Sequence, residues 1–394
     1  MNVSRIIIMI RKPILYFAFV ALMAFASCQS GNSEYFKQAF KLSKQNRLSI
    51  RVSHDSVAFV LKDNKLLFEA DVNGEKDTVQ LDLGYNAPMG KLVSSTERPD
   101  LQYNEATVTT LEKSKLHMAL DTVNYAFGNF TAHAYCNFIQ VDSIIPYCDA
   151  EPGFDYPLVG SFGLLKSYHY LGLNFTDNVM VMDQVFEKDI DLTGYQEVKC
   201  KFKMISLLFI TLNVNGKEHN CIFDTGNSGG IVLKDKKRVD ENRETDIPFD
   251  GAYAVAASGP TEKTVFCYAP NENVTMDSYS CEADVLYVPD IDMDNVGMKF
   301  ISRFDWIISP SLDKVYFRPR NVKEEPFEIH PYKITTANGR ISILRRCLSM
   351  NPEFNVGDII KSVNGEEITE ENICHYYELL KEAKDWSAFD IQVK

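Results

Sequence analysis

Two stretches of this 394-residue sequence decide the expected fold: residues 72–84, VNGEKDTVQLDLG, and residues 214–226, VNGKEHNCIFDTG. Each begins with Val-Asn-Gly and reaches an Asp-x-Gly triplet at the same distance from that turn. Each matching residue of the second stretch lies 142 positions after its counterpart, as Asp224 does after Asp82 (224 − 82). This shared register indicates a duplicated unit, and we expect the duplication to bring the two carboxyl groups together.

The remainder of both units reads as β-structure. Asn73-Gly74 is a tight hairpin signal between two strand-like runs. The first unit closes at Tyr156–Gly160 and the second at Val296-Gly297, and each closing segment precedes a short helix or turn and two strands. The polar stretch Phe186–Glu197 is the expected boundary between the units, and Arg318–Pro326 is a second expected linker.

Paired aspartates suit one particular chemistry. Two carboxyl groups ~3 Å apart can hold a water molecule, and because both cannot ionise cheaply they share one proton. One carboxylate then acts as a base on the water, while the other carboxyl group protonates a scissile carbonyl oxygen. Each aspartate needs a sharp turn after a buried strand, and Gly84 and Gly226 permit that turn.

The sequence resembles the retropepsin/pepsin-like aspartic proteases over roughly residues 50–320. The resemblance rests on Asp224-Thr225-Gly226 after an apolar strand, on its duplicate at Asp82, and on the closing segment from Val296. It implies a mainly β fold with lobe 1 at residues 50–190, lobe 2 at 191–320 and a cleft between them. Asp82 and Asp224 would form the catalytic dyad of an endopeptidase acting on peptides or unfolded proteins. Gly84, Thr225 and Gly226 would support the dyad, with the Thr225 hydroxyl bonding across to the other lobe.

The first triplet departs from the family pattern. Leu83 stands where Thr or Ser is usual, so half of the pair of interlobe hydroxyl groups is missing. Tyr103 and Tyr125 are both candidates for the tyrosine of a flap. The alternative hypothesis is therefore a catalytically inactive lipoprotein of the same fold that binds peptides or partner proteins.

The last part of the chain, residues 326–394, resembles a PDZ domain. The resemblance is carried by the stretch Val356–Gly365, VGDIIKSVNG, and by the amphipathic pattern of Glu370–Lys384. It implies a small α+β domain that binds an extended peptide as an added strand. The alternative is a packing module without a ligand.

The N-terminus has the pattern of an export signal. Residues 1–27 contain basic residues and then an apolar run, and they end in Phe25-Ala26-Ser27 before Cys28. This arrangement resembles a bacterial lipobox and predicts a signal peptide, lipidation of Cys28, and an anchor and tether at residues 28–49. The protein is then expected in the cell envelope on a periplasmic or surface membrane face. A plain secretory signal or a short uncleaved anchor are the alternatives.

Charge and cysteine content limit the partners, cofactors and disulfides that can be expected. A net charge of −13 without a basic patch disfavours a nucleic-acid partner. No His or Cys cluster suggests a metal site, and no cofactor motif is present in the sequence. Cys136 with Cys148, and Cys267 with Cys281, are close enough in sequence to staple a loop each, whereas buried free thiols are the alternative.

Overall fold

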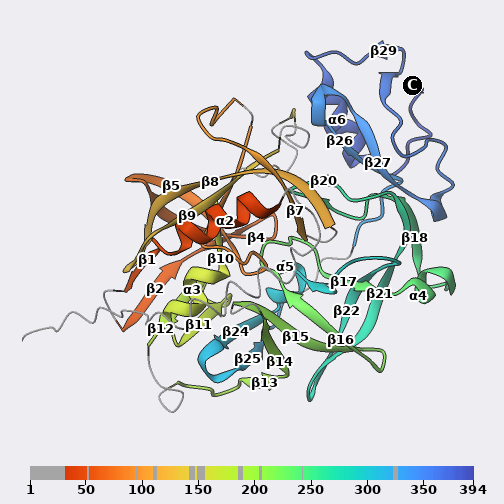
Figure 1. Cartoon of the computed structure of the whole chain (residues 1–394). Helices are drawn as coiled ribbons and strands as arrows, with labels where there is room; N and C mark the ends of the chain where they lie inside the picture. The colour runs from red at the N-terminus through yellow and green to blue at the C-terminus, as the bar shows by residue number, and fades with distance from the viewer. Residues whose placement is uncertain are drawn as a thin grey trace, which may run out of the picture.

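A computed structural model describes residues 32–394 apart from short gaps. The gaps are residues 51–52, 95, 110–112, 142–146, 149–155, 185–189, 204–205, 242 and 323–326. The predicted signal peptide and Cys28 lie outside the described residues. The described chain is mainly β, as expected (Figure 1).

The two duplicated stretches form the same hairpin. Strands β4 (Lys65–Val72) and β5 (Glu75–Asp82) pair in the first half, and β15 (Leu207–Val214) and β16 (Lys217–Phe223) pair in the second. The turn residues have positive φ in both, 55° and 92° at Asn73-Gly74 and 50° and 89° at Asn215-Gly216. These values are those of the two-residue turn that Asn-Gly favours, so the hairpin prediction is confirmed.

Each hairpin belongs to a large sheet of its own half. The first sheet has nine strands in the order β1-β9-β6-β10-β5-β4-β8-β7, with β3 paired to β4. The second has ten in the order β14-β15-β16-β23-β17-β22-β21-β18-β27-β26. The other strands of the first sheet are β1 (Arg47–Ile50), β3 (Val60–Lys62), β6 (Met89–Val93), β7 (Asn104–Thr109), β8 (Lys113–Phe127), β9 (Phe130–Gln140) and β10 (Leu158–Gly160). Those of the second are β14 (Cys200–Lys203), β17 (Ile231–Lys234), β18 (Ile247–Gly251), β21 (Thr264–Met276), β22 (Tyr279–Val288), β23 (Asn295–Val296), β26 (Tyr332–Thr335) and β27 (Ser342–Cys347). A small hairpin of β19 (Val255–Ala256) and β20 (Gly259–Pro260) and the helix α4 (Lys236–Glu241) complete this half.

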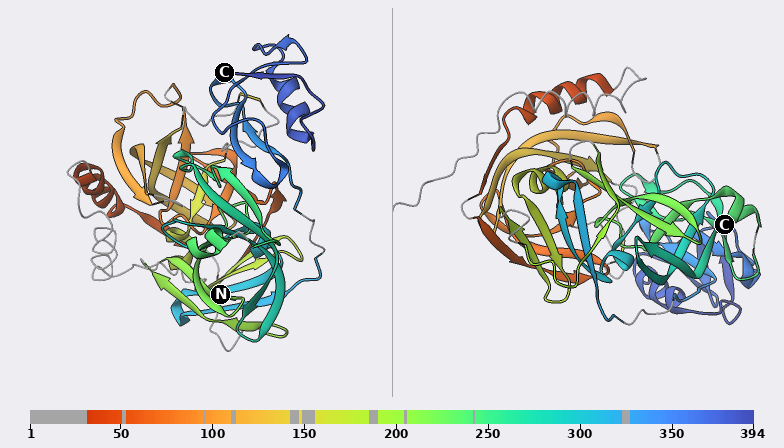
Figure 2. Two further views of the ribbon diagram at one scale, coloured as in Figure 1. Left: turned by 90° about the vertical axis from the view of Figure 1, so that its right-hand side faces the viewer. Right: turned by 90° about the horizontal axis from the view of Figure 1, so that it is seen from below.

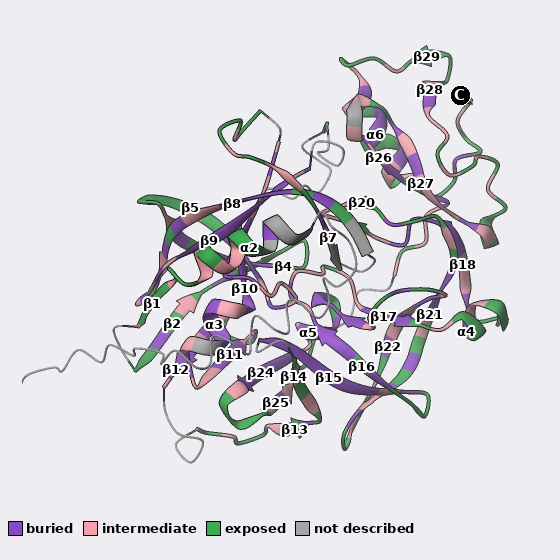
Figure 3. Cartoon of the chain, in the orientation of Figure 1, coloured by how far each residue is buried: buried purple, intermediate pink, exposed green. Residues whose placement is uncertain are grey.

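A six-stranded sheet joins the two halves in the order β13-β25-β24-β11-β12-β2. The first half supplies β2 (His54–Ala58), β11 (Tyr170–Asn174) and β12 (Val179–Asp183). The second half supplies β13 (Gln196–Val198), β24 (Phe304–Ser309) and β25 (Lys314–Pro319). Because β11 pairs directly with β24, the backbone fixes the position of one half against the other. A single apolar core with Trp306 fully buried extends through both halves, and β15, β16 and β24 lie within it (Figure 3).

The C-terminal segment has its own small core but shares a sheet with the second half. Helix α6 (Ile373–Glu382) and the strands β28 (Ile360–Val363), β29 (Glu366–Glu367) and β30 (Ile391–Val393) surround the buried Tyr377 and Trp386. Strand β27 pairs with β18, so the ten-stranded sheet continues into this segment. The segment lies at one corner of the molecule (blue in Figure 1). We call residues 327–394 the C-terminal module.

The stretch expected as a tether is part of the fold. Helix α2 (Asn32–Ser43) lies across the outside of the first sheet (Figure 2), and β1 pairs with β9. Tyr35 of this helix is buried, and its hydroxyl donates to Asn137 Oδ1 at 2.9 Å. The expectation of a tether running to residue 49 is therefore wrong from Asn32 onward, because the helix buries an aromatic side chain with a hydrogen-bond partner.

The cysteines do not pair with their neighbours in the sequence. A disulfide joins Cys148 to Cys374 across 226 residues and ties the first half to helix α6. The neighbouring backbone supports the same contact, since the Thr336 hydroxyl accepts from the Cys148 N–H at 3.2 Å. The loop staple between Cys267 and Cys281 is wrong, because the β21–β22 hairpin places Cys281 opposite Val274, seven residues from Cys267. Cys136 is a buried free thiol, so its pairing with Cys148 is wrong as well.

Removal of the disulfide tests how the C-terminal module is held. A cross-link that closes a long loop restricts the unfolded chain, so the double variant Cys148→Ala/Cys374→Ala is expected to lose roughly 2–5 kcal/mol of stability. Denaturant unfolding of the oxidised protein measures the loss. Wild-type protein in a reducing agent is the control and should match the double variant. A non-reducing peptide map without the Cys148–Cys374 cross-link would contradict the assignment.

Candidate active site

The two aspartates end equivalent strands. Asp82 is the last residue of β5, and Asp224 directly follows β16. A short strand runs parallel to each, with Gly160 of β10 beside Asp82 and Val296 of β23 beside Phe223. The Asp224 N–H donates to the Val296 carbonyl at 3.0 Å. The parallel neighbours therefore hold both aspartates at the same point of the two sheets.

The structure brings the two carboxyl groups together. A Cβ atom added to Gly84 would lie 2.4 Å from Asp224 Oδ1, and one added to Gly226 would lie 2.4 Å from Asp82 Cγ. Each carboxyl group thus rests on the glycine of the other triplet, at a separation that no other residue would allow. Both residues are half-buried.

Glycine is also required where the closing segments turn. A Cβ atom on Gly160 would lie 2.1 Å from the Ala87 carbonyl oxygen, and one on Gly297 would lie 2.5 Å from the Gly229 carbonyl oxygen. Helix α3 (Ser161–Ser167) follows the first of these glycines, and helix α5 (Met298–Ile301) follows the second. The short helices expected after the closing segments are therefore present in both halves.

The Thr225 hydroxyl group makes the expected hydrogen bonds between the triplets, and the Leu83 side chain cannot make the reciprocal ones. The buried Thr225 hydroxyl accepts from the Leu83 N–H at 2.8 Å and donates to the Leu81 carbonyl at 2.9 Å. The side chain of Leu83 is fully buried in the shared core instead. One half of the junction is thus polar, and the other is held by apolar packing.

Burial and mutual repulsion make both carboxyl groups hard to ionise together. The pKa of Asp82 lies well above its ordinary value because burial disfavours its charge, and because the charge and hydrogen bond of Asp224 favour its proton. Burial also raises the pKa of Asp224, but hydrogen bonds from Asn295, Gly226 and Asn227 oppose this rise. Both carboxyl groups therefore favour a state in which the pair keeps one proton.

Backbone N–H groups lower the pKa of both carboxyl groups, those of Gly84 and Tyr85 that of Asp82 and those of Gly226 and Asn227 that of Asp224, whereas a side-chain amide reaches Asp224. Asp224 Oδ1 accepts from the N–H groups of Gly226 and Asn227 at 2.9 and 3.1 Å, and Asp224 Oδ2 accepts from Asn295 Nδ2 at 2.7 Å. Asp82 Oδ1 is buried and has no hydrogen-bond partner in the described part of the chain. Asn295 is not part of the Asp-x-Gly pattern, and its only signal in the sequence is a polar residue directly before the closing Val296-Gly297.

Of the two flap candidates, Tyr125 is excluded by its position. It lies in β8 with its ring stacked on Phe127, and its hydroxyl donates to the Pro88 carbonyl. Because it is buried in the core of the first half, Tyr125 cannot close over a substrate. Tyr103 directly precedes β7 and is half-buried.

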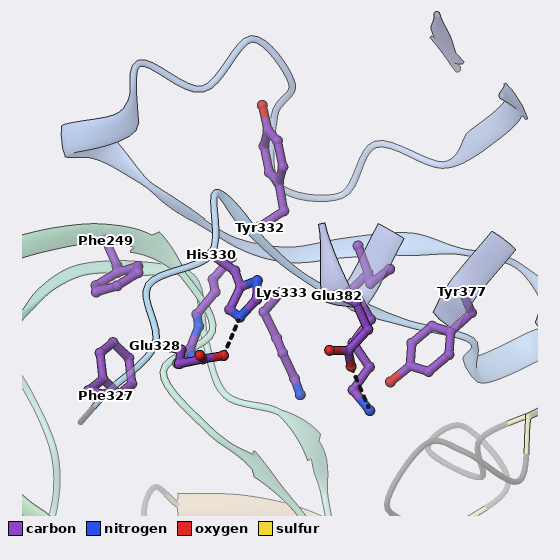
Figure 4. A pocket seen from close by; sticks show the side chains of 11 residues that line it. Phe249, Phe327, Glu328, His330, Tyr332, Lys333, Tyr377 and Glu382 are labelled. Carbon is purple, nitrogen blue, oxygen red and sulfur yellow. Dashed lines mark ion pairs between the residues drawn. The ribbon is translucent and has the colours of Figure 1, made fainter. Parts of the chain in front are cut away.

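A separate pocket lies in the C-terminal module, with a volume of about 310 Å³. Its walls are β26 and helix α6, and Phe249 of β18 and the stretch 327–330 close one end (Figure 4). Cationic and anionic side chains both line it, and two ion pairs, His330–Glu328 and Lys381–Glu382, lie within it. The pocket thus combines an aromatic end with charged walls.

Comparison of the chain with protein-family models and with curated proteins finds no match. Within the described residues, no helix is both long enough and apolar enough to span a membrane. Over the same residues, no group of three or more His, Cys, Asp or Glu side chains is arranged to hold a metal ion. The carboxyl pair is therefore the feature of this chain that bears on its function.

The raised pKa of Asp82 predicts a cost to stability at neutral pH. Because the folded state favours the protonated form, the stability that this proton confers is present below the unfolded pKa of about 3.9 and is lost as the pH rises through the folded pKa. We expect Asp82→Asn, which cannot ionise, to be more stable than wild type at pH 7 by about 1–2 kcal/mol. The gain should vanish near pH 4, as thermal unfolding across this range would measure.

The control for this experiment is Asp63→Asn, in the exposed turn between β3 and β4. Asp63 has a positive φ that asparagine also tolerates, so this exchange keeps the turn. It should leave the pH profile of stability unchanged. An Asp82→Asn profile that runs parallel to wild type from pH 4 to pH 7 would contradict the raised pKa.

Proposed function

We propose that the chain is an aspartic-type endopeptidase with a two-lobed, pepsin/retropepsin-like fold and a PDZ-like C-terminal module. The observation that carries the proposal is the placement of the Asp82 and Asp224 carboxyl groups, each resting on the glycine of the other triplet. The shared six-stranded sheet and the repeated hairpins support the two-lobed arrangement. Peptides or unfolded proteins would be the substrates.

The proposed reaction uses water as the nucleophile. One carboxylate takes a proton from the water, and the water oxygen bonds to the scissile carbonyl carbon. At the same time the partner carboxyl group gives its proton to the carbonyl oxygen. The carboxyl group that took the water proton then gives it to the amine nitrogen as the C–N bond of the tetrahedral diol breaks, and the other carboxylate takes a proton from a diol hydroxyl group as the new carbonyl forms. The pair returns to one proton and one charge, which is the state that burial and repulsion favour in Asp82 and Asp224.

The pocket of the C-terminal module supports a second contact with peptides. In a PDZ-like module, an extended peptide adds to the edge of a strand beside a helix. Strand β26 is the last strand of its sheet, and helix α6 forms the other wall of the pocket. A module of this kind would hold part of an unfolded chain while another part reaches the carboxyl pair.

The alternative function is peptide binding without catalysis. Leu83 favours it, because this buried side chain cannot supply the second hydroxyl group between the triplets. The carboxyl pair would then persist as a remnant of a catalytic ancestor. The two functions differ in a single assay, since only an endopeptidase releases new peptide ends.

Substitution of either aspartate tests the proposed reaction. A single carboxyl group cannot act as both base and acid, so Asp82→Asn and Asp224→Asn should each lower peptide cleavage by more than about 10³-fold. The assay follows cleavage of a mixed peptide library by mass spectrometry at mildly acidic pH, where one carboxyl group stays protonated. A transition-state-mimicking aspartic-protease inhibitor should abolish wild-type turnover.

Asp277→Asn is the matched control, since it removes an exposed carboxyl group from the turn between β21 and β22, at the end of the second hairpin opposite to Asp224. It should cleave the library at the wild-type rate. Turnover that survives both dyad substitutions would overturn the mechanism. No turnover in any form, together with retained binding of library peptides, would favour the non-catalytic alternative.

We also propose that the protein is exported and lipid-anchored in a bacterial cell envelope through Cys28. The disulfide between Cys148 and Cys374 supports export, because such bonds persist in oxidising compartments. Cys28→Ser should leave the precursor uncleaved or release the protein in soluble form, as membrane fractionation and mass would show. Unchanged processing and membrane association would rule out the lipidated cysteine, and labelled fatty acid on the wild type alone would support it.

A further inference from the structure

The duplicated backbone carries different side chains next to the two aspartates. Leu158 pairs with Gln80, two residues before Asp82, and Asn295 pairs with Ile222, two residues before Asp224. Leu158 and Asn295 are thus equivalent positions. Only Asn295 brings a hydrogen-bond donor to its aspartate.

A relay that begins at the backbone fixes the direction of this hydrogen bond. The Gly229 N–H can only donate, and it donates to Asn227 Oδ1 at 2.8 Å. The Asn227 amide nitrogen must then face Asn295, and it donates to Asn295 Oδ1 at 2.7 Å. Consequently the Asn295 amide nitrogen faces Asp224 and donates to Oδ2 at 2.7 Å. Both amide orientations follow from one backbone donor.

The three neighbours that hydrogen-bond to the Asp224 carboxyl group all donate to it. The relay and the N–H groups of Gly226 and Asn227 together supply three hydrogen bonds to its two oxygens. Such donors favour the ionised carboxylate, and hydrogen bonds to charged groups are among the strongest in proteins. The N–H groups of Gly84 and Tyr85 likewise lower the pKa of Asp82, the titratable group that faces Asp224. The donor that distinguishes the two carboxyl groups is therefore Asn295, and in the described part of the chain Asp82 Oδ1 has no partner.

We propose that the Gly229–Asn227–Asn295 relay assigns the shared proton, making Asp224 the ionised base and Asp82 the protonated acid. Asn295 is a positioning residue in this scheme, since it acts through Asp224. The chemical meaning rests on the proposed hydrolysis: Asp224 takes the proton of the attacking water, and Asp82 gives its own proton to the carbonyl oxygen. After this step Asp224 is protonated and Asp82 is charged, so the total charge of the pair is unchanged.

The order of ionisation in the wild type is the first test. Full-length protein labelled with ¹³C at the aspartate carboxyl carbons reports both groups by NMR, and the Asp82→Asn and Asp224→Asn variants identify the two signals. We expect the Asp224 carbon to shift to its ionised position at lower pH than the Asp82 carbon. Earlier ionisation of Asp82 would overturn the proposal without any further variant.

Asn295→Leu, which places the first-half residue in the second half, is the second test. Loss of the donor should move the titration of Asp224 upward by about one to two pH units, the scale of one hydrogen bond to a charged group. An unchanged titration of Asp224 would overturn the role of Asn295. If this variant does not fold, Asn227→Ala breaks the relay one step earlier and should move the same titration in the same direction.

Asn137→Leu is the matched control. Asn137 is also a buried amide, but its side chain bonds to the hydroxyl groups of Tyr35 and Tyr85. Its loss should lower stability and leave the titration of Asp224 unchanged, which separates a general structural effect from an effect on the proton.

Activity provides an independent measurement. If peptides are cleaved, the acidic limb of the kcat/KM profile should move upward in Asn295→Leu by the same amount as the NMR titration. Different results would refute the proposed hydrolysis and the proposed role of the relay. A wild type without turnover would refute the hydrolysis, while the titration order would still decide whether the relay assigns the proton.

Discussion

The rest of the structure depends on holding two acidic groups against each other. Burial disfavours the charge of each carboxyl group, and a second charge at contact distance adds to the penalty for ionising both. A loosely held pair would separate and return to water. Close approach of Asp82 and Asp224 therefore requires a frame whose packing outweighs the repulsion. The fully buried strand residues before each triplet, among them Leu81 and Phe223, belong to that frame.

Backbone contacts provide most of the positioning of the two carboxyl groups. Gly84 and Gly226 let each carboxyl group rest on the opposite chain, and no larger residue fits there. The parallel strands β10 and β23 fix the ends of β5 and β16, and the pairing of β11 with β24 fixes one half against the other. Side chains then reinforce the junction, with Thr225 bridging both Leu83 and Leu81. The separation of the carboxyl groups thus depends little on flexible parts of the chain.

The sequence was informative where structure depends on local signals and poor where it depends on distant pairing. Asn-Gly turns and the Asp-x-Gly triplets predicted the hairpins and the approach of Asp82 and Asp224, because these features need only a few adjacent residues. The disulfide of Cys148 joins positions 226 residues apart, and spacing alone does not reveal such a pair. Helix α2 and the continuation of the ten-stranded sheet into β27 depend on docking partners far along the chain. Asn295 was missed for the same reason, since its role is visible only beside β16.

A duplicated frame by itself does not decide where a shared proton lies. In a symmetric pair both carboxyl groups hold the proton equally well, so a preferred site requires different surroundings for the two groups. Three equivalent positions differ in the same sense: Leu83 against Thr225, Tyr85 against Asn227, and Leu158 against Asn295. In each case the second half has the threonine or asparagine: Asn227 and Asn295 enter the hydrogen bonds around Asp224, and Thr225 bonds across to Leu81 and Leu83. The backbone therefore brings the two carboxyl groups together, and the divergence of the neighbouring side chains makes them unequal.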